Sequence, residues 1–197
     1  NFELQLRPGA FHTAQRIHVH DIECRSANGK PIDLERAGAL FEQAFAAVWT
    51  GKAESDGFNK LILALPCSWR EAALIRALAR YRQQTGLDPS QSIQEQALAN
   101  NTRIAALILK FFKSRFDPQL PETMETRAAR SSKFEFAIEA ALNEVVSLDE
   151  DRALRRIAHL VKAIRRTNYY QPGADGQPKA YMSFKIDSHA VAELPAP

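Results

Sequence analysis

Residues Arg166–Asp187 read RTNYYQPGADGQPKAYMSFKID and mark the point where the character of the sequence changes. Upstream of this stretch, apolar residues recur at helical spacing over nearly every segment. Beyond Gly176 the pattern changes, and Met182, Phe184 and Ile186 alternate with polar residues as in a strand with one apolar face. The chain ends soon afterwards at Pro197, and it begins with Asn1 instead of methionine. We therefore expect a piece of a longer protein.

Composition predicts one globular unit. The 197 residues are 45% hydrophobic and 25% charged, which are average values for folded domains. No apolar run approaches the roughly 18 residues needed to cross a bilayer, so no membrane partner is expected. Two cysteines, Cys24 and Cys67, are too few for a disulfide framework, which favours a cytoplasmic protein. The net charge of +3 permits contact with nucleic acid without requiring it.

The first fifty residues predict a β hairpin followed by a helix. Alternating apolar residues mark one strand at 2–6 and another at 16–24. In the second strand, apolar residues change parity between 17–19 and 22–24, so a bulge is expected near His20–Asp21. A helix then follows over 34–50, with Asp33 as its N-cap and one apolar stripe facing the hairpin or core. The stripe consists of Leu34, Ala37, Phe41, Ala44, Phe45 and Val48.

The middle of the chain predicts a helical bundle. Residues 58–65 fit a short helix, although a buried strand remains an alternative for so short a run. Capping residues then mark the starts of the longer helices. These helices are expected at 69–85 after Ser68, from Asp88–Pro89 to 99, from Thr102 to 116, from Thr123 to 146, and from Ser147 to about 167.

Two groups of side chains suggest binding functions, each with a simpler structural explanation. His18 and His20 share one face of a strand, with Cys24 at the same parity, and such a pair could bind zinc. However, a third and a fourth ligand are needed, and the expected bulge spoils the alignment with Cys24. A polar strand face explains them better. A basic ridge at helical spacing is suited to phosphates, but a solvated helix face explains it better, and no nucleic-acid partner is expected. The basic ridge consists of Arg152, Arg155, His159, Lys162 and Arg166.

No catalytic, cofactor-binding or metal-binding residue is predicted in this sequence. Cys67 precedes a helix N-terminus, where a thiolate is stabilised, but no histidine is near it and small buried cysteines are common. Trp49, Tyr169 and Tyr170 are expected to be packing groups. The sequence contains no Walker loop, no zinc-protease motif and no glycine-rich dinucleotide fingerprint.

Several long stretches resemble the large NAD-specific glutamate dehydrogenases of bacteria. The strongest is SLDEDRALRRIAHLVKAIRRTNYYQ at 147–171, followed by KAYMSFKID at 179–187. Earlier stretches agree in the same order: HDIE at 20–23, FEQAFAAVWTGKAESDGFNKLIL at 41–63, and SWREAALIRALARYRQQTGLDPSQSIQEQALANN at 68–101.

The resemblance implies an enzyme that converts L-glutamate, NAD and water to 2-oxoglutarate, ammonia and NADH. It also implies three parts in this chain. Residues 1–51 resemble the tail of an ACT-like module, 52–168 a helical domain, and 169–197 a connector and strand leading to a catalytic domain. The family's catalytic lysine, glycine-rich substrate motif and NAD-binding domain are expected beyond Pro197, so this segment is expected to bind no NAD. The strand at 182–186 is then expected to lack its partners here, and 188–197 to be poorly anchored or to pack opportunistically.

The sequence therefore predicts a mainly α fold: a helical bundle with a small N-terminal β hairpin and a C-terminal strand. Its expected role is architectural or regulatory, within an oligomeric enzyme whose catalytic domain is its main partner. Two alternatives remain open at this point. One is an amino-acid-sensing regulatory domain, and the other is a basic helical domain that binds nucleic acid through the basic ridge.

Overall fold

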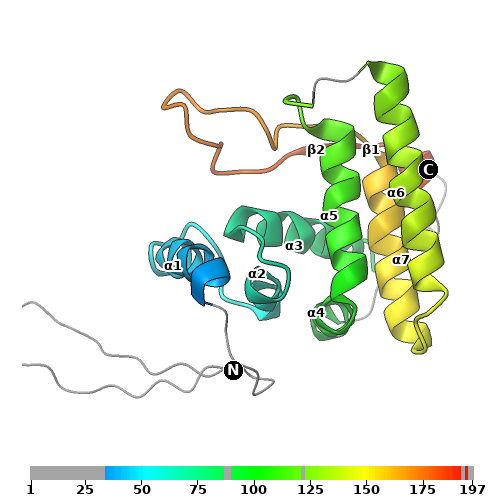
Figure 1. Cartoon of the computed structure of the whole chain (residues 1–197), viewed down its shortest axis with the longest axis horizontal. Coiled ribbons are helices and arrows are strands. Elements are labelled where there is room, and N and C mark those ends of the chain that lie inside the picture. The colour runs from blue at the N-terminus through cyan, green and yellow to red at the C-terminus, as the bar shows by residue number, and fades with distance from the viewer. Residues whose placement is uncertain (1–33, 87–89, 121–122, 192–193, 195–197) are drawn as a thin grey trace, which may run out of the picture.

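The computed structural model describes residues 34–86, 90–120, 123–191 and 194, and its fold is mainly helical. Figure 1 shows α5, α6 and α7 side by side at one end of the molecule, with α3 running across from them towards α1. The seven described helices are α1 (Leu34–Trp49), α2 (Lys60–Ala64), α3 (Trp69–Gln84), α4 (Gln91–Asn100), α5 (Thr102–Phe116), α6 (Met124–Leu142) and α7 (Leu148–Ala163). The mainly α prediction is confirmed. The hairpin predicted in the first 33 residues, with His18, His20, Cys24 and Asp33, lies outside the described residues.

Residues 58–64 are helical, and Leu65 is the C-cap. A 3-10 turn, η1 (Gly57–Asn59), leads directly into α2. The side chain of Asp56 accepts a hydrogen bond from the backbone N–H of Phe58 and so begins the turn. Phe58, Leu61 and Ile62 are buried, which explains why this run has the composition of either a buried helix or a buried strand.

The capping residues predicted most helix starts. Ser68 and Glu71 form a complete capping box at α3, and Thr123 caps α6. Ser147 accepts from the backbone N–H of Glu150 at the start of α7, but the Glu150 carboxylate accepts instead from Asn100 and Asn101. The prediction that Thr102 caps α5 is wrong. Asn101 occupies the N-cap without a side-chain cap, because its amide donates to the Ala97 carbonyl and to Glu150.

The strand near the end of the chain has a partner, contrary to expectation. The last helix stops at Ala163, and β1 (Ile164–Thr167) pairs antiparallel with β2 (Phe184–Ile186). Ile164 is fully buried opposite Ile186, and the backbone N–H of Asp187 donates to the Ala163 carbonyl. Backbone groups beyond the end of α7 no longer have partners within the helix. The pairing of β1 with β2 supplies hydrogen bonds for them. Helix α6 also ends earlier than predicted, at Leu142 instead of Val146.

One hydrophobic core joins the helices. It draws buried side chains from α2, α3, α4, α5, α6 and α7, and β1 and Tyr169 add to it. The end of the described chain packs on this core too. Val191 is buried and Leu194 packs against the core, so of the two alternatives expected for this end of the chain, these two residues show the packed one. In the part of the chain that the structure describes, no helix combines the length and apolar character of a membrane span.

The stripe predicted on the first helix divides in the structure. Of the stripe residues, Ala37 and Ala44 are buried, whereas Phe45 is 47% exposed. Outside the predicted stripe, Ala47 is buried and Trp49 is 75% exposed. Helix α1 packs against α2 and α3, and small residues allow that close approach. The prediction that Trp49 is a packing group is therefore not met by the described residues.

Candidate functional site

The described helices meet the segment 164–187 at a junction built around two arginines, Arg70 and Arg115. This segment leaves the end of α7 as β1, extends outward as an arm (residues 168–183) and returns as β2 (Figure 1). Arg70 lies in the first turn of α3, and Arg115 lies in the last turn of α5. We call this group of contacts the arginine junction.

Arg115 fixes the end of α7. Its guanidinium donates to the carbonyls of Val161 and Ile164, the latter at 3.0 Å. The last carbonyls of a helix have no partner within the helix, so a cation that donates to them satisfies hydrogen bonds and complements the helix dipole. Burial lowers the pKa of Arg115 from its ordinary value, although the group remains a cation at any physiological pH.

Arg70 holds the two sides of the arm. Its guanidinium donates to the Tyr169 carbonyl at 3.1 Å and to the Lys179 carbonyl at 2.9 Å. Its Cζ atom also lies 5.0 Å from the centroid of the Tyr169 ring, in a cation–π contact. The residues that Arg70 bridges are ten positions apart in the sequence, so one side chain ties the outgoing and returning parts of the arm to α3.

Aromatic rings fill the space beneath the arm. Tyr169 meets Phe112 edge-on with ring centroids 5.3 Å apart, and it meets Tyr170 at 4.9 Å. Edge-on contacts of this kind add to the gain from burial. Burial raises the pKa of Tyr169, and the charge of Glu71 raises it further; burial and then Asp117 raise the pKa of Tyr170. Both phenols therefore remain protonated at neutral pH.

Charges beside the rings are paired. Glu71 accepts from Ser68 at the start of α3 and forms an ion pair with Lys113 of α5. Burial opposes ionisation of Glu71, but Lys113 and the Ser68 donors together hold its pKa below the ordinary value. Cys67 is buried beside this pair, and burial raises its pKa to about 12. At neutral pH the arginine junction therefore offers neither a reactive thiolate nor a free base, which fits a role in positioning backbone.

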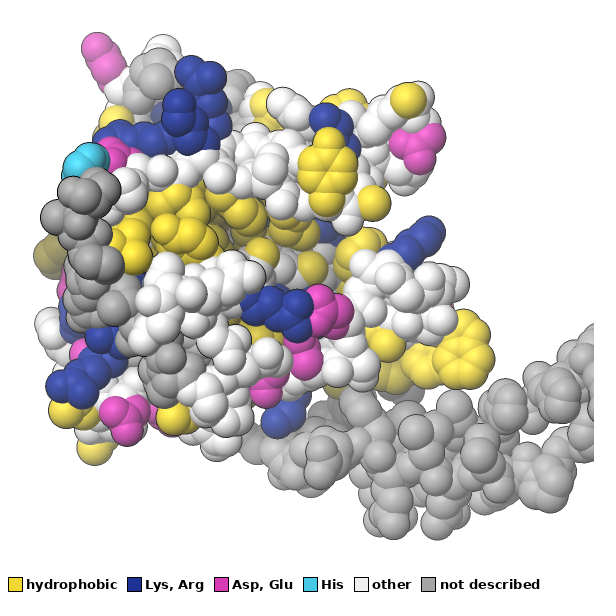
Figure 2. Space-filling view, turned by 180° about the vertical axis from the view of Figure 1, so that it is seen from behind, with side chains coloured by type: hydrophobic (Ala, Val, Ile, Leu, Met, Phe, Trp, Pro, Cys, Tyr) yellow, Lys and Arg dark blue, Asp and Glu magenta, His cyan; other side chains and the backbone are white. Residues whose placement is uncertain are grey.

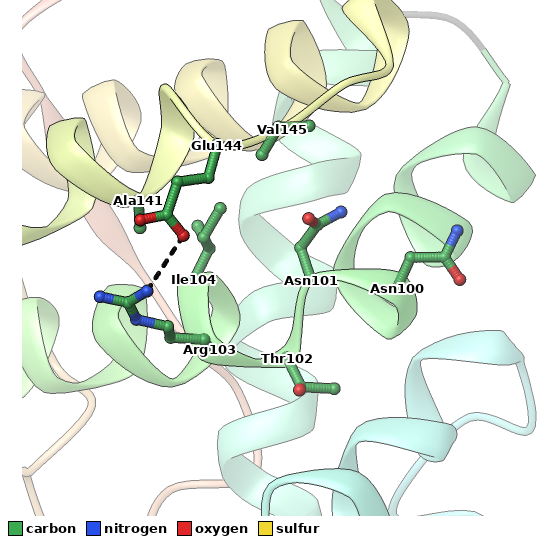
Figure 3. Close-up of a pocket in the computed structure, with 8 residues that line it drawn as sticks. All are labelled: Asn100, Asn101, Thr102, Arg103, Ile104, Ala141, Glu144 and Val145. Carbon is green, nitrogen blue, oxygen red and sulfur yellow. Dashed lines mark hydrogen bonds and ion pairs between the residues drawn. The ribbon is translucent and has the colours of Figure 1, made fainter.

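A small cavity lies at the corner between α4 and α5, near the end of α6 (Figure 3). Its volume is about 230 Å³, and Arg103 and Glu144 form an ion pair of 3.2 Å at its edge. Both of these side chains are 70% exposed, so the pair is screened by solvent. The lining residues are Asn100, Asn101, Thr102, Arg103, Ile104, Ala141, Glu144 and Val145. They provide no nucleophile with an adjacent base, as nucleophilic catalysis requires.

The basic ridge predicted from the sequence is largely neutralised by α6. Arg155 is paired with Glu139 and with Asp151, and Lys162 is paired with Glu135 at 2.8 Å. His159 lies 3.5 Å from Glu139. Arg166 belongs to β1 instead of α7, so it does not continue the helical spacing.

The residues that the structure describes give little support for a metal site or a cofactor site. They contain no group of three or more histidines, cysteines or carboxylates placed to hold a metal ion. The glycines of the arm, Gly173 and Gly176, lead to β2 and not to a helix N-terminus. A dinucleotide pyrophosphate is normally held where a glycine-rich turn opens a helix, and the glycines of the arm are not placed in that way.

Arg70 and Arg115 were not singled out from the sequence. Both lie on helices that carry several other charged residues, some of them buried, and sequence spacing does not distinguish them. The available signal was position: a cation in the last turn of a helix, such as Arg115, suits carbonyls at helix ends.

Two parts of the chain match models of known protein families. Residues 53–118 match the family model described as glutamate dehydrogenase, helical motif 3. Residues 137–197 match the model described as bacterial NAD-glutamate dehydrogenase, catalytic domain. The NAD-specific glutamate dehydrogenase of Pseudomonas aeruginosa is 41% identical over 179 residues, or 91% of this chain. Those of Halomonas elongata and Mycobacterium tuberculosis are 35% and 32% identical over 91% and 85% of the chain.

The chain is homologous to a segment of the bacterial NAD-specific glutamate dehydrogenases. It spans 11% of the length of the Pseudomonas and Halomonas proteins and 10% of the Mycobacterium protein. The resemblance inferred from the sequence is therefore confirmed. The match to the glutamate dehydrogenase catalytic-domain model begins within α6, upstream of the arm.

The arginine junction connects the two matched segments. Arg70 and Arg115 lie within residues 53–118, and the four carbonyls that they contact lie within 137–197. A glutamate dehydrogenase helical motif thus holds the end of α7 and both sides of the arm in the part that matches the catalytic-domain model.

Proposed function

We propose that this chain is part of an enzyme that oxidises L-glutamate with NAD and water to 2-oxoglutarate, ammonia and NADH. Within that enzyme the segment has an architectural role. The observation behind this proposal is that Arg70 and Arg115 donate to four backbone carbonyls across the two family segments. A guanidinium presents several donors in a rigid plane, so it restrains the position of the carbonyls it binds. The catalytic and NAD-binding residues lie elsewhere in the enzyme, and no step of the reaction is assigned to this segment.

The proposed organisation follows the three ranges predicted from the sequence. Residues 1–51 are a remnant of an ACT-like module, 52–168 are a helical support, and 169–197 connect to the catalytic region. The start of the helical-motif match at residue 53 supports the first boundary. A cytoplasmic location and a homo-oligomer belong to the same proposal.

Pairing of the basic ridge argues against the nucleic-acid alternative. Two cations of the ridge, Arg155 and Lys162, pair with carboxylates from α6 or α7, which reduces the positive field available to phosphates. The amino-acid-sensing alternative has little support among the described residues. The cation and the carboxylate at the small cavity, Arg103 and Glu144, pair with each other and are both 70% exposed.

The first experiment assays the complete gene product for glutamate-dependent reduction of NAD, followed by NADH absorbance. Activity with glutamate and NAD is expected, and its absence would overturn the enzymatic assignment. The architectural role is then tested by Arg115→Ala and Arg70→Ala in the same protein. We expect a lower Tm and a lower kcat with little change in KM for glutamate or NAD, because the arginines touch backbone and not substrate.

Matched variants separate positioning from general loss of charge. Arg103→Ala removes an exposed arginine that pairs with the equally exposed Glu144, and it is expected to leave Tm and kcat near the parent values. Arg115→Lys is expected to recover only part of the loss, because an ammonium does not reproduce the planar set of donors. If Arg115→Ala changed KM alone, the arginine junction would have a binding role and the architectural proposal would be wrong.

A further inference from the structure

The two-stranded sheet that follows α7 concentrates positive charge on its outer face. Arg165 and Arg166 lie on β1, Lys185 lies on β2, and all three residues are exposed. Figure 2 shows Lys and Arg side chains gathered at the upper left, over the end of the molecule where the turned view of Figure 1 places β1 and β2. We call Arg166 and Lys185, which lie opposite each other in the register, the cationic pair.

A β-bulge in β1 turns Arg166 outward. The register runs from Ile164↔Ile186 to Arg166↔Lys185, so β1 advances two residues where β2 advances one, and Arg165 is the extra residue. Side chains alternate between the faces of a regular strand, so Ile164 and Arg166 would otherwise share a face. A bulge re-aims the side chains that follow it. Ile164 therefore stays buried in the core while Arg166 lies beside Lys185 on the exposed face.

The cationic pair has no counter-charge among the residues that the structure describes. No ion pair or side-chain hydrogen bond joins either member to another described residue. Directly opposite residues on antiparallel strands have Cβ atoms about 4.5–5.5 Å apart, and like charges at that distance destabilise the pairing. The sheet therefore contains a repulsion that an anionic partner would relieve.

The carboxylate next to the sheet is already engaged. Asp187 follows β2 directly, and it accepts hydrogen bonds from Arg165 at 2.6 Å and from the backbone N–H of His189 at 3.2 Å. The hydrogen bond from Arg165 holds the pKa of Asp187 below its ordinary value. Asp187 thus neutralises the extra residue of the bulge and leaves the cationic pair exposed.

Two other partners fit the cationic pair less well. Nucleic acid is bound through an extended row of free cations, but on the neighbouring α7 Arg155 and Lys162 pair with carboxylates of α6. A second copy of this segment could offer only acidic groups that mostly have partners already. Near the start of α7, Glu144 pairs with Arg103, Asp151 pairs with Arg155, and Glu150 accepts from Asn100 and Asn101.

The rest of the enzyme polypeptide fits better. Both strands lie within residues 137–197, which match the catalytic-domain model. The chain spans 11% of the length of the Pseudomonas relative, so most of a protein of that length lies outside it. A surface on the same polypeptide is held at a high effective concentration, so a contact made by few charges is enough. Carboxylates are the anions that a protein surface supplies, and a guanidinium can bind one through two parallel hydrogen bonds.

We propose that the cationic pair, Arg166 and Lys185, binds a carboxylate-bearing surface in the part of the enzyme polypeptide outside this segment. The bulge serves this contact, because it keeps Ile164 in the core and presents both cations on one face. The inference rests on the proposed place of the chain within a larger enzyme, but not on the role proposed for Arg70 and Arg115.

The test is zero-length coupling with a carbodiimide in the complete gene product. The reagent activates a carboxylate, and a lysine amine in direct contact with that carboxylate then forms an amide with it. We expect peptide mapping by mass spectrometry to find Lys185 joined to an aspartate or glutamate outside this segment. Arg166→Gln should lower the yield several-fold, because the surface is then held by one cation. Arg152→Gln, at an exposed position on α7, is the matched control and should leave the yield unchanged.

Hydrogen exchange of the backbone amides at 164–167 and 184–186 gives a second readout, whose sign should reverse. In the 197-residue chain, Lys185→Glu replaces a repulsive cross-strand pair by an attractive one, so these amides should exchange more slowly. In the complete gene product the same change sets a carboxylate against the proposed acidic surface, so they should exchange faster. Lys60→Glu, at an exposed position on α2, should change neither rate.

The outcomes separate this inference from the others. Absence of any Lys185 coupling in the complete gene product would overturn it, and so would slower exchange of the sheet amides in both proteins after Lys185→Glu. Coupling of Lys185 to this same segment in a second, isotope-labelled copy would identify a second copy as the occupant and would also overturn it. If Lys185 coupled as expected but the gene product failed to oxidise glutamate, the enzymatic assignment alone would be wrong.

Discussion

The thiol of Cys67 lies just before α3, where the helix dipole normally favours a thiolate. Burial has the larger effect here and raises its pKa to about 12, and the neighbouring Glu71 charge acts in the same direction. The sequence predicted a buried cysteine from the lack of a nearby histidine, and the structure confirms this. The sequence did not predict that the Glu71 carboxylate lies beside Cys67. The capping box of α3 is enough to explain a glutamate at position 71.

We predict that Cys67 is inert to alkylation in the folded chain. Iodoacetamide at pH 8 should label Cys67 in urea but not in native buffer, as peptide mapping by mass spectrometry would show. The raised pKa also affects stability. The neutral thiol stabilises the fold below the ordinary pKa of 9.0, and this contribution is lost progressively as pH rises towards 12. Rapid labelling of Cys67 in native buffer would contradict the prediction.

At the scale of elements, local capping chemistry predicted most of the helix starts. Ser68, Thr123 and Ser147 each accept the backbone hydrogen bond that their positions suggested. Helix ends were less predictable. The run through Ile164 and Arg166 continues the helical spacing, and only its pairing with Phe184–Ile186 makes it a strand. That pairing spans residues far apart in the sequence, so no local pattern contains it.

The arginine junction was unpredictable for the same reason. Arg115 contacts Val161 and Ile164 more than forty residues away, and Arg70 contacts Lys179 across 109 positions. Side chains that bind distant backbone carbonyls leave no spacing in the sequence, because any arginine near a helix end offers the same donors. The buried network around Asp56 has the same character.

Asp56 links η1 to α3, and we predict that this link is strong. Its carboxylate accepts from Phe58 N–H and from Arg76, whose side chain is only 5% exposed. Asp56→Ala leaves a buried guanidinium without its carboxylate, so we expect a loss of about 3 kcal/mol in the free energy of unfolding, measured in urea. Glu54→Ala is the matched control, since it breaks the exposed pair with Arg80 and should cost less than about 1 kcal/mol. Equal losses in both variants would show that burial does not govern this network.

At the scale of the whole molecule, the two family segments share one core. Leu154, Ile157 and Val161 of α7 are fully buried in the same cluster as Leu74 and Leu78 of α3 and Ile108 of α5. Neither segment therefore encloses its own hydrophobic surface. Contacts of α7 with α3, α4 and α5 cross the interval between residues 118 and 137 that separates the two family matches. A unit of this size with a shared core is expected to unfold cooperatively.

This shared core predicts that damage in one segment is felt in the other. Ile157→Ala removes a fully buried side chain from α7 and should lower the free energy of unfolding by about 2–5 kcal/mol. In native-state hydrogen exchange, the slowest amides of α3 and α5 should then lose as much protection as those of α7, because they exchange only through global unfolding. Val146→Ala, at a fully exposed position, is the control and should change neither set. If Ile157→Ala destabilised α6 and α7 while α3 kept its full protection, the helical motif and the catalytic-domain segment would be separate folding units, and the arginine junction would be an interface between them.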